Sequence, residues 1–304
     1  MTELKEIKES KEGKVLEPVK RLSPTSVNAW FKCPREFYYN YIEKQKVKPN
    51  IALVKGSVVH SVLENFYRGY KPNLKREIKR LFIKEWEKQK NLIKQLELNP
   101  INLIKEKRDA FRIVMGFYNK LKITLDILVK YGKAENERHA YYLTKPKLRE
   151  MYIKNEDLHC SGFIDRIHED FDGIVTLGDY KTSSKYGIGL NQSYKRQLGI
   201  YALLYENDTG RMPDFVSIIF LRYGEEFLLE VTPSLMKFAR DTLQETWART
   251  RSVDIKDYPL KEGKLCGWCN FQHICSGKEE IEKQKRLDKL KKLVEDDNNE
   301  KSKS

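Results

Sequence analysis

The spacing of hydrophobic and polar residues predicts a helical N-terminal half. Ser23 followed by Pro24 is typical of a helix start, and Pro34 should break or kink that helix after Cys33. Apolar residues recurring every three to four positions predict further helices, with Pro100 separating the last two. These predicted helices cover residues 56–70, 73–98 and 101–131.

The pattern changes near Ala134, where short apolar runs bounded by turn residues predict strands. The predicted strands are 140–143, 147–153, 158–169 and 173–181, with turns at NED (155–157) and DFDG (170–173). A helix over 191–206, a hairpin around Gly224 and a last helix over 233–250 follow. This order predicts an α/β fold in which helices flank a mixed central sheet.

Two charged residues, which are costly to bury, end the strand at 173–181. Side chains at i and i+2 on a strand point to the same face, so Asp179 and Lys181 should lie side by side, with Tyr180 pointing the other way. An ion pair alone would explain them. Asp165 lies on the strand before the DFDG turn and should come close to Asp179. If the turn is centred between residues 171 and 172, Asp165 pairs with residue 178. If the hairpin has a one-residue bulge, Asp165 pairs with residue 179. Close carboxylates repel unless a cation lies between them, and oxygen ligands suit Mg²⁺ or Mn²⁺.

Two predicted helices carry polar residues that could serve the same site. Gly56 and His60 share a helix face, so His60 could reach the sheet as a nitrogen ligand if the glycine permits close approach. Gln197 and Tyr201 are also four residues apart, and the glutamine could orient water or phosphate. A structural histidine, and a surface glutamine beside a core tyrosine, are the simpler interpretations.

The sequence CGWCNFQHIC places three cysteines within ten residues, which indicates a metal site in a cytosolic protein. Zinc could bind Cys266, Cys269, His273 and Cys275. An iron–sulfur cluster would require a fourth thiolate, for which Cys33 in FKCPREF is the candidate. Local spacing does not separate these alternatives. Cys160 lies inside a predicted strand and is interpreted as a small buried residue.

Composition and charge indicate the cellular compartment and the kind of binding partner. No apolar run approaches the roughly 18 residues of a membrane span, the charged N-terminus has no signal-peptide core, and five cysteines do not suggest disulfides, so we expect a cytoplasmic protein. Residues 1–20 and 277–304 read as charged tails, the second disordered or a frayed helix. The formal charge is +14, and residues 71–133 hold 17 Lys and Arg against seven Asp and Glu. Either this basic segment binds a polyanion such as nucleic acid, or it is a solvated surface.

The motifs CPREFYY, GSVVHSVLE, GFIDRI, GDYKTS and Q-x3-Y, followed by the cysteine cluster, occur in one order over about residues 22–276. Together they resemble the RecB-like branch of the PD-(D/E)xK nuclease superfamily, in particular AddB-type and CRISPR-associated adaptation nucleases that carry an iron–sulfur cluster. The resemblance implies a restriction-endonuclease-like domain over 21–276, with 71–133 as a basic helical insertion and 257–276 as a cysteine-cluster staple. The length of that insertion argues against a CRISPR role.

The resemblance also implies roles for individual residues. Metal ligands would be His60, Asp165, Asp179 and the Tyr180 carbonyl. The catalytic set would add Lys181, Gln197 and Tyr201, and Glu137 would match an acidic position of some relatives. Cys33, Cys266, Cys269 and Cys275 would hold a structural 4Fe–4S cluster.

The activity expected from this resemblance is a Mg²⁺- or Mn²⁺-dependent DNA exonuclease acting on single strands or ends in repair or recombination, with a possible helicase or repair-complex partner. The basic segment would track the DNA backbone, and Trp86 could stack on unpaired bases unless it faces the core. The alternatives are a catalytically silent or partner-dependent binding subunit, a CRISPR adaptation nuclease, and a zinc-stapled nucleic-acid-binding protein.

Overall fold

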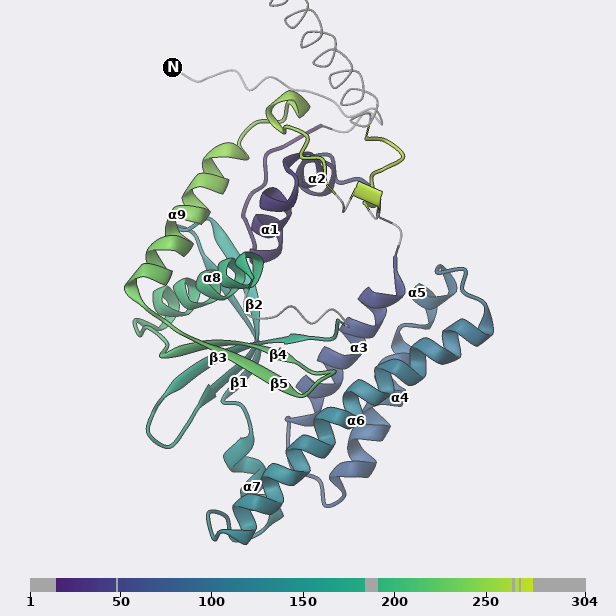
Figure 1. Ribbon diagram of the computed structural model, residues 1–304, viewed down its shortest axis with the longest axis vertical. Coiled ribbons are helices and arrows are strands. Elements are labelled where there is room, and N and C mark those ends of the chain that lie inside the picture. Colours follow the sequence, from purple (N-terminus) through teal and green to yellow (C-terminus); the bar gives the residue numbers. More distant parts are fainter. Residues whose placement is uncertain (1–14, 48, 184–190, 264–265, 268, 276–304) are drawn as a thin grey trace, which may run out of the picture. The chain divides into compact units, whose positions relative to one another are not determined.

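The computed structural model describes residues 15–47, 49–183, 191–263, 266–267 and 269–275 (Figure 1). Contacts divide the chain into two compact units. The larger comprises 19–28 and 48–251, and the smaller comprises 1–18, 29–47 and 252–304. The predicted tail at 277–304 lies outside the described residues. No helix in the described ranges is both long enough and apolar enough to cross a bilayer.

A mixed sheet forms the centre of the larger unit, as predicted. Within the described residues it has five strands in the order β1-β2-β3-β4-β5. β3 and β4 run parallel, and the other neighbours are antiparallel. The strands are β1 (Leu148–Asn155), β2 (Cys160–Glu169), β3 (Val175–Lys181), β4 (Phe215–Phe220) and β5 (Glu225–Glu230). The parallel pair requires a crossover, which α8 (Gln192–Thr209) supplies.

Helices cover both faces of this sheet (Figure 1). On one face, α8 packs against the strands and α9 (Pro233–Arg249) packs against α8. Their close contact depends on Gly199, because a Cβ there would lie 3.1 Å from the Cβ of Ala239. On the other face, Tyr180 and Ile219 join an apolar cluster of several helices. These are α3 (Ile51–Phe66), α4 (Leu74–Lys88), α6 (Pro100–Lys130) and α7 (Glu137–Thr144), with the short α5 (Lys90–Lys94) beside them.

The predicted strand at 140–143 is wrong, because these residues lie in α7. Asn136 caps this helix by accepting a hydrogen bond from the His139 amide. Tyr141 is fully buried and donates a 2.7 Å hydrogen bond to the Phe66 carbonyl. Packing of Tyr141 against α3 therefore outweighs the β propensity of residues 140–143 (AYYL).

Two helix boundaries also differ from the prediction. The helix predicted over 73–98 ends at Lys88 and resumes as α5. The helix predicted to begin at 56 begins at Ile51, where Asn50 accepts a hydrogen bond from the Leu53 amide. Trp86, offered as a base-stacking residue, is only 4% exposed and belongs to the helical core.

Aromatic packing holds the smaller unit together. α1 (Pro24–Lys32) and α2 (Pro34–Phe37) are separated at Cys33, which has an extended backbone, as Pro34 predicts. Among the described residues of this unit, a π-helix (Tyr38–Ile42) and a short 3₁₀ helix (Ile255–Asp257) follow. Buried Tyr258 contacts the rings of Trp30, Phe37 and Tyr38, and its carbonyl accepts a hydrogen bond from Arg35. The C-terminal segment is thereby fixed to the N-terminal helices.

An ion-pair network provides a test of how α6 is fixed. Arg222 donates two hydrogen bonds to Asp109, at 2.6 and 2.7 Å, and Lys55 donates a third at 2.8 Å. The bonds from Arg222 hold the pKa of Asp109 well below its usual value despite partial burial, and Lys55 lowers it further. Asp109→Asn should therefore lower the free energy of unfolding at pH 7 by about 2 kcal/mol, measured by urea denaturation.

The pH dependence of this effect follows from the lowered pKa. The ionised carboxylate stabilises the fold above the unfolded-state pKa of about 3.9, so the difference between wild type and Asp109→Asn should shrink as the pH falls below about 4. Asp126→Asn, at an exposed ion pair of the same helix, is the matched control and should cost under about 1 kcal/mol. Equal losses in the two variants would contradict a special role for Asp109.

Candidate active site

The end of β3 holds a buried carboxylate that two side chains position. Asp179 is 3% exposed, and Lys181 Nζ lies 2.7 Å from its Oδ2. Gln197 on α8 bridges the pair: its Nε2 donates to Asp179 Oδ1 at 2.7 Å, and its Oε1 accepts from Lys181 at 3.1 Å. Tyr201, one turn later, lies 3.4 Å from the same Oδ1. The predicted proximity of Asp179 and Lys181 is confirmed, and Gln197 is a buried partner of both rather than a surface residue.

Asp165 on β2 reaches the same place. The hairpin pairs Arg166 with Gly178, a register that sets Asp165 opposite Asp179 and agrees with the bulged alternative of the two considered. Asp165 Oδ2 accepts a 2.7 Å hydrogen bond from the Tyr180 amide, so the backbone of β3 fixes the carboxylate. The predicted convergence of the two carboxylates is thus present in the fold.

His60 on α3 approaches these carboxylates from the helical side. Its Nε2 lies 3.1 Å from the Tyr180 carbonyl oxygen, and its Nδ1 lies 3.3 Å from Asp165 Oδ1. A Cβ at Gly56 would make only an ordinary 3.7 Å contact with Thr182, so this approach does not require a glycine. Burial alone would lower the pKa of His60, but hydrogen bonds with Asp165 and Glu150 outweigh it and raise the pKa to about 10.

Glu150 belongs to this group, and the sequence analysis missed it. Its Oε1 lies 3.7 Å from His60 Nδ1. Glu150 has a φ of 47° inside β1, and the register pairs the residues on either side of it, Arg149 and Met151, with β2. A non-glycine residue with positive φ is strained, and such strain concentrates at functional sites. The observed register pairs Asn155 with Cys160 and so places Glu150 opposite Asp165, whereas a turn centred on NED (155–157) would have placed it opposite Gly162.

Glu137, the acidic position suggested by the resemblance, lies elsewhere. It is the first residue of α7, where it accepts a hydrogen bond from the Tyr70 hydroxyl at 3.1 Å and pairs with Lys122 at 3.0 Å. A carboxylate in the first turn of a helix is favourable because of the helix dipole. These contacts give Glu137 a structural explanation.

The donor set suits a hard divalent cation. Among the residues that the structure describes, His60, Glu150 and Asp165 are the one group whose ligand atoms all lie within 4.8 Å of one another. Burial raises the pKa of Asp179, Asp165 raises it further, and Lys181 opposes the shift. Its Oδ2 is buried and, within the described ranges, makes no hydrogen bond besides the ion pair with Lys181. Crowded carboxylates with a spare buried lone pair fit Mg²⁺ or Mn²⁺.

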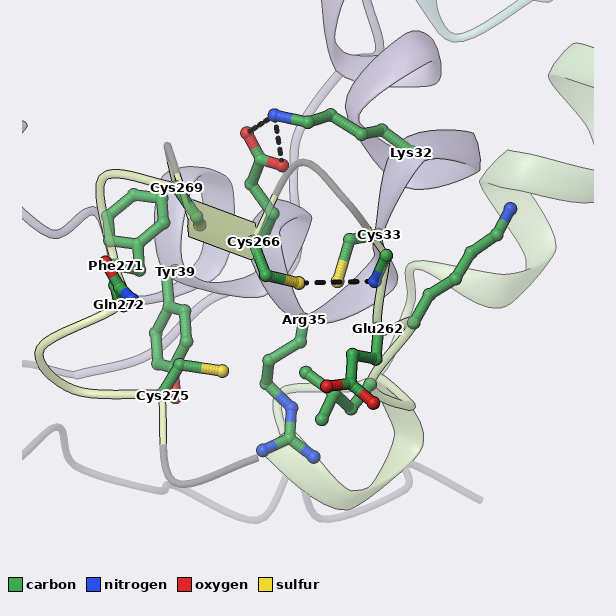
Figure 2. A pocket seen from close by; sticks show the side chains of 14 residues that line it. Lys32, Cys33, Arg35, Tyr39, Glu262, Cys266, Cys269, Phe271, Gln272 and Cys275 are labelled. Carbon is green, nitrogen blue, oxygen red and sulfur yellow. Dashed lines mark hydrogen bonds and ion pairs between the residues drawn. The ribbon is translucent and has the colours of Figure 1, made fainter. Parts of the chain in front are cut away.

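The cysteines form a separate site in the smaller unit. Cys33, Cys266, Cys269 and Cys275 line one cavity of about 250 Å³, into which Figure 2 shows their side chains directed. Lys32, Arg35 and Tyr39 also line it. Cys160, by contrast, is fully buried in β2, as predicted. The sequence-distant Cys33 is therefore brought to the three clustered cysteines.

The spacing of these sulfur atoms bears on the choice of metal. Tetrahedral zinc with bonds of about 2.3 Å places its sulfur ligands only about 3.8 Å apart. Across the described part of the chain, no three of these cysteines bring their sulfurs within 4.8 Å of one another. The three clustered sulfurs are therefore not placed as the ligands of one zinc ion in this structure.

Comparison with known proteins identifies the class. The model of the PD-(D/E)XK nuclease superfamily matches residues 21–276, so the chain belongs to this superfamily of enzymes that hydrolyse phosphodiester bonds in nucleic acids. No curated protein matches. A solved structure from Eubacterium rectale, provisionally described as an exonuclease, is 13% identical over 84% of this chain and 88% of its own, with a TM-score of 0.49. The structure of SSO0001 has 13% sequence identity to this chain. The match covers 84% of this chain and 85% of that one, with a TM-score of 0.35.

The bridging glutamine can be tested by stability. Gln197→Leu removes the amide that joins Asp179 to Lys181, so it should lower the free energy of unfolding of the metal-free protein by about 1–3 kcal/mol. Tyr201→Phe should cost less, because its 3.4 Å contact is long for an O–H···O hydrogen bond. Urea denaturation with a chelator present measures both. A larger loss for Tyr201→Phe would contradict the bridging role.

Proposed function

We propose that this protein is a metal-dependent DNA nuclease of the RecB-like branch, acting as an exonuclease on single strands or DNA ends. One observation carries the proposal: His60, Glu150, Asp165, Asp179 and Lys181 come together from α3 and three neighbouring strands in a chain of a nuclease superfamily. Burying two carboxylates, with three partly exposed ionisable groups held against them, is unfavourable unless the group serves a cation and an anionic substrate.

The cation would be held by His60, Glu150, Asp165 and Asp179, with the Tyr180 carbonyl. When bound, a divalent cation lowers the pKa of a coordinated water and offsets charge on the phosphate. His60 Nε2 and the Tyr180 carbonyl oxygen lie 3.1 Å apart, close enough for both to serve one ion. The imidazole and the carbonyl are thus compatible with one shared ion.

Lys181 would act on the substrate rather than on the metal. Its ammonium group is partly exposed, and it lies 5.7 Å from the ring centre of Tyr194 and 3.1 Å from Gln197. These contacts hold the charge at the end of β3, where it would stabilise the negative charge that grows on phosphate during attack. Gln197 and Tyr201 are positioning residues in this scheme, because they contact Asp179 and Lys181.

The substrate assignment rests on charge. The basic surplus of 71–133 lies largely on α4, α5 and α6, and α4 and α6 bury their apolar sides in the helical core. Arg80, Lys88 and Lys122 pair with nearby acids, and the unpaired remainder of the surplus is left for solvent or for a phosphate backbone. DNA, a repair or recombination pathway and a helicase or repair-complex partner follow from the resemblance. A catalytically silent binding subunit is less well supported, since the ligand types and the lysine are all in place.

The four cysteines would hold a structural 4Fe–4S cluster. Four thiolates are the ligand set that such clusters use, and the four cysteines line one cavity. The cluster would join Cys33, between α1 and α2, to the C-terminal segment of the same unit.

The nuclease proposal predicts metal-dependent cleavage that requires Asp179. With Mg²⁺ or Mn²⁺, the wild type should degrade end-labelled single-stranded DNA, and Asp179→Ala or Lys181→Ala should reduce kcat/KM at least about 100-fold, because each removes charge that acts on the transition state. Separate labels at the two ends report the polarity of digestion. Equal cleavage by wild type and Asp179→Ala would rule out this site.

A pair of conservative variants separates the two acidic candidates. Glu150→Gln keeps the size of the side chain but removes a ligand charge beside His60, whereas Glu137→Gln makes the same change at the start of α7. The first should lower activity and raise the Mn²⁺ concentration needed for half-maximal rate, and the second should do neither. The reverse result would move the metal site to Glu137.

The cluster proposal predicts about four irons and four sulfides per chain in anaerobically purified protein, with a brown colour and no zinc. Cys33→Ser should lose iron and lower the melting temperature, whereas Cys160→Ser should retain iron because that residue is buried in β2. Metal analysis and visible absorption provide the measurement. Stoichiometric zinc without iron would support the zinc-stapled alternative.

A further inference from the structure

An exposed pair of aromatic rings lies beside the candidate active site. Tyr152 on β1 and Phe163 on β2 are direct cross-strand partners, with ring centres 4.9 Å apart. Tyr152 is 50% exposed and Phe163 is 55% exposed. Cross-strand aromatic pairs stabilise sheets, but large apolar side chains left half in water gain less from burial than covered ones do. Stability alone therefore does not explain this pair.

The pair adjoins the metal ligands along the chain and in space. Each ring lies two residues from a carboxylate of the site: Tyr152 from Glu150, and Phe163 from Asp165. Two residues of a strand span about 7 Å, a distance that one nucleotide of an extended single strand covers. A group bound on the rings would thus be a neighbour of a phosphate bound at the carboxylates.

A groove connects the two. Phe163 lines one side of it together with Glu150, and residues of α3 line the other. The α3 side carries small side chains together with Leu53, His60 and Glu64; the small residues are Ala52, Gly56, Ser57 and Ser61. The groove therefore has Phe163 on its sheet side, two hydroxyls on its α3 side, and the proposed ligands His60 and Glu150 in its lining. Tyr152 adjoins it as the cross-strand partner of Phe163.

We propose that Tyr152 and Phe163 form a stacking platform for an unpaired nucleobase adjacent to the cleaved phosphate, which makes single-stranded polynucleotide the preferred substrate. This inference rests on the proposed nuclease function. Aromatic side chains stack on bases of any sequence, because every base has a π-face. In a duplex those faces are covered by neighbouring base pairs, so the platform discriminates by strandedness and not by sequence.

The first test is kinetic. Single-stranded DNA oligonucleotides, each with one abasic position, are compared with the intact oligonucleotide. For the wild type, the loss of one base next to the cleaved bond should raise KM by about 5- to 100-fold, and kcat should change less. Phe163→Leu should raise KM for the intact strand by a similar factor and no longer respond to the abasic position. If the variant keeps the abasic sensitivity of the wild type, the platform is wrong.

The second test reads binding without cleavage. An oligonucleotide carrying 2-aminopurine, a base whose fluorescence is quenched by stacking, is titrated with protein in the presence of Ca²⁺. Quenching by the wild type should be lost in Phe163→Leu and in Tyr152→Leu. Unchanged quenching in both variants would overturn the proposal. If the wild type quenches but cleaves nothing, the nuclease proposal fails while the platform stands; if it cleaves without quenching at any position, the platform fails alone.

Phe171→Leu is the matched control. It makes the same side-chain change at a ring that is 80% exposed in the turn between β2 and β3, outside the groove. Its KM, abasic response and quenching should equal those of the wild type. Urea denaturation of all variants separates a structural role: a lower unfolding midpoint with unchanged abasic response and quenching would show that the pair serves only the sheet, and would also overturn the proposal.

Discussion

Burial of two neighbouring carboxylates is the constraint on which the larger unit depends. Asp165 and Asp179 are each under 10% exposed, and they lie opposite each other where β2 and β3 end their pairing. Groups from each of the neighbouring elements offset the repulsion between these two carboxylates. The β3 backbone donates to Asp165, Gln197 of α8 donates to Asp179, and His60 of α3 approaches from the other side. The sheet and the helices on both its faces are thus joined through charges rather than through apolar contacts alone.

This arrangement explains why the local geometry around the site is irregular. Glu150 has a left-handed backbone conformation in the middle of a strand, which a regular hairpin would avoid. The irregularity lies directly opposite Asp165, so it brings a third carboxylate toward His60 instead of leaving it in solvent. Strain in β1 and repulsion among acids are both unfavourable, and a bound divalent cation would relieve the repulsion.

The smaller unit is stabilised mainly by aromatic packing rather than by buried charges. The described part of its C-terminal segment is held by the ring of Tyr258 among three aromatic residues and by the hydrogen bond that Arg35 donates to the Tyr258 carbonyl. Four cysteines line one cavity of the same unit. Tyr258 and Phe271 are both buried, so aromatic packing orders this segment.

The sequence by itself determined the alternation of elements, the mixed sheet, the helix break at Pro34 and the proximity of Asp179 and Lys181, because these depend on local periodicity and on the geometry of one strand. Tertiary structure decided the rest. The AYYL segment became helical because Tyr141 packs under α3, and Glu150 joined the site because a hairpin register and a strained residue aim it there. Cys33 and His60 reached their sites across many residues of chain, and such long-range approach depends on packing that no local pattern encodes.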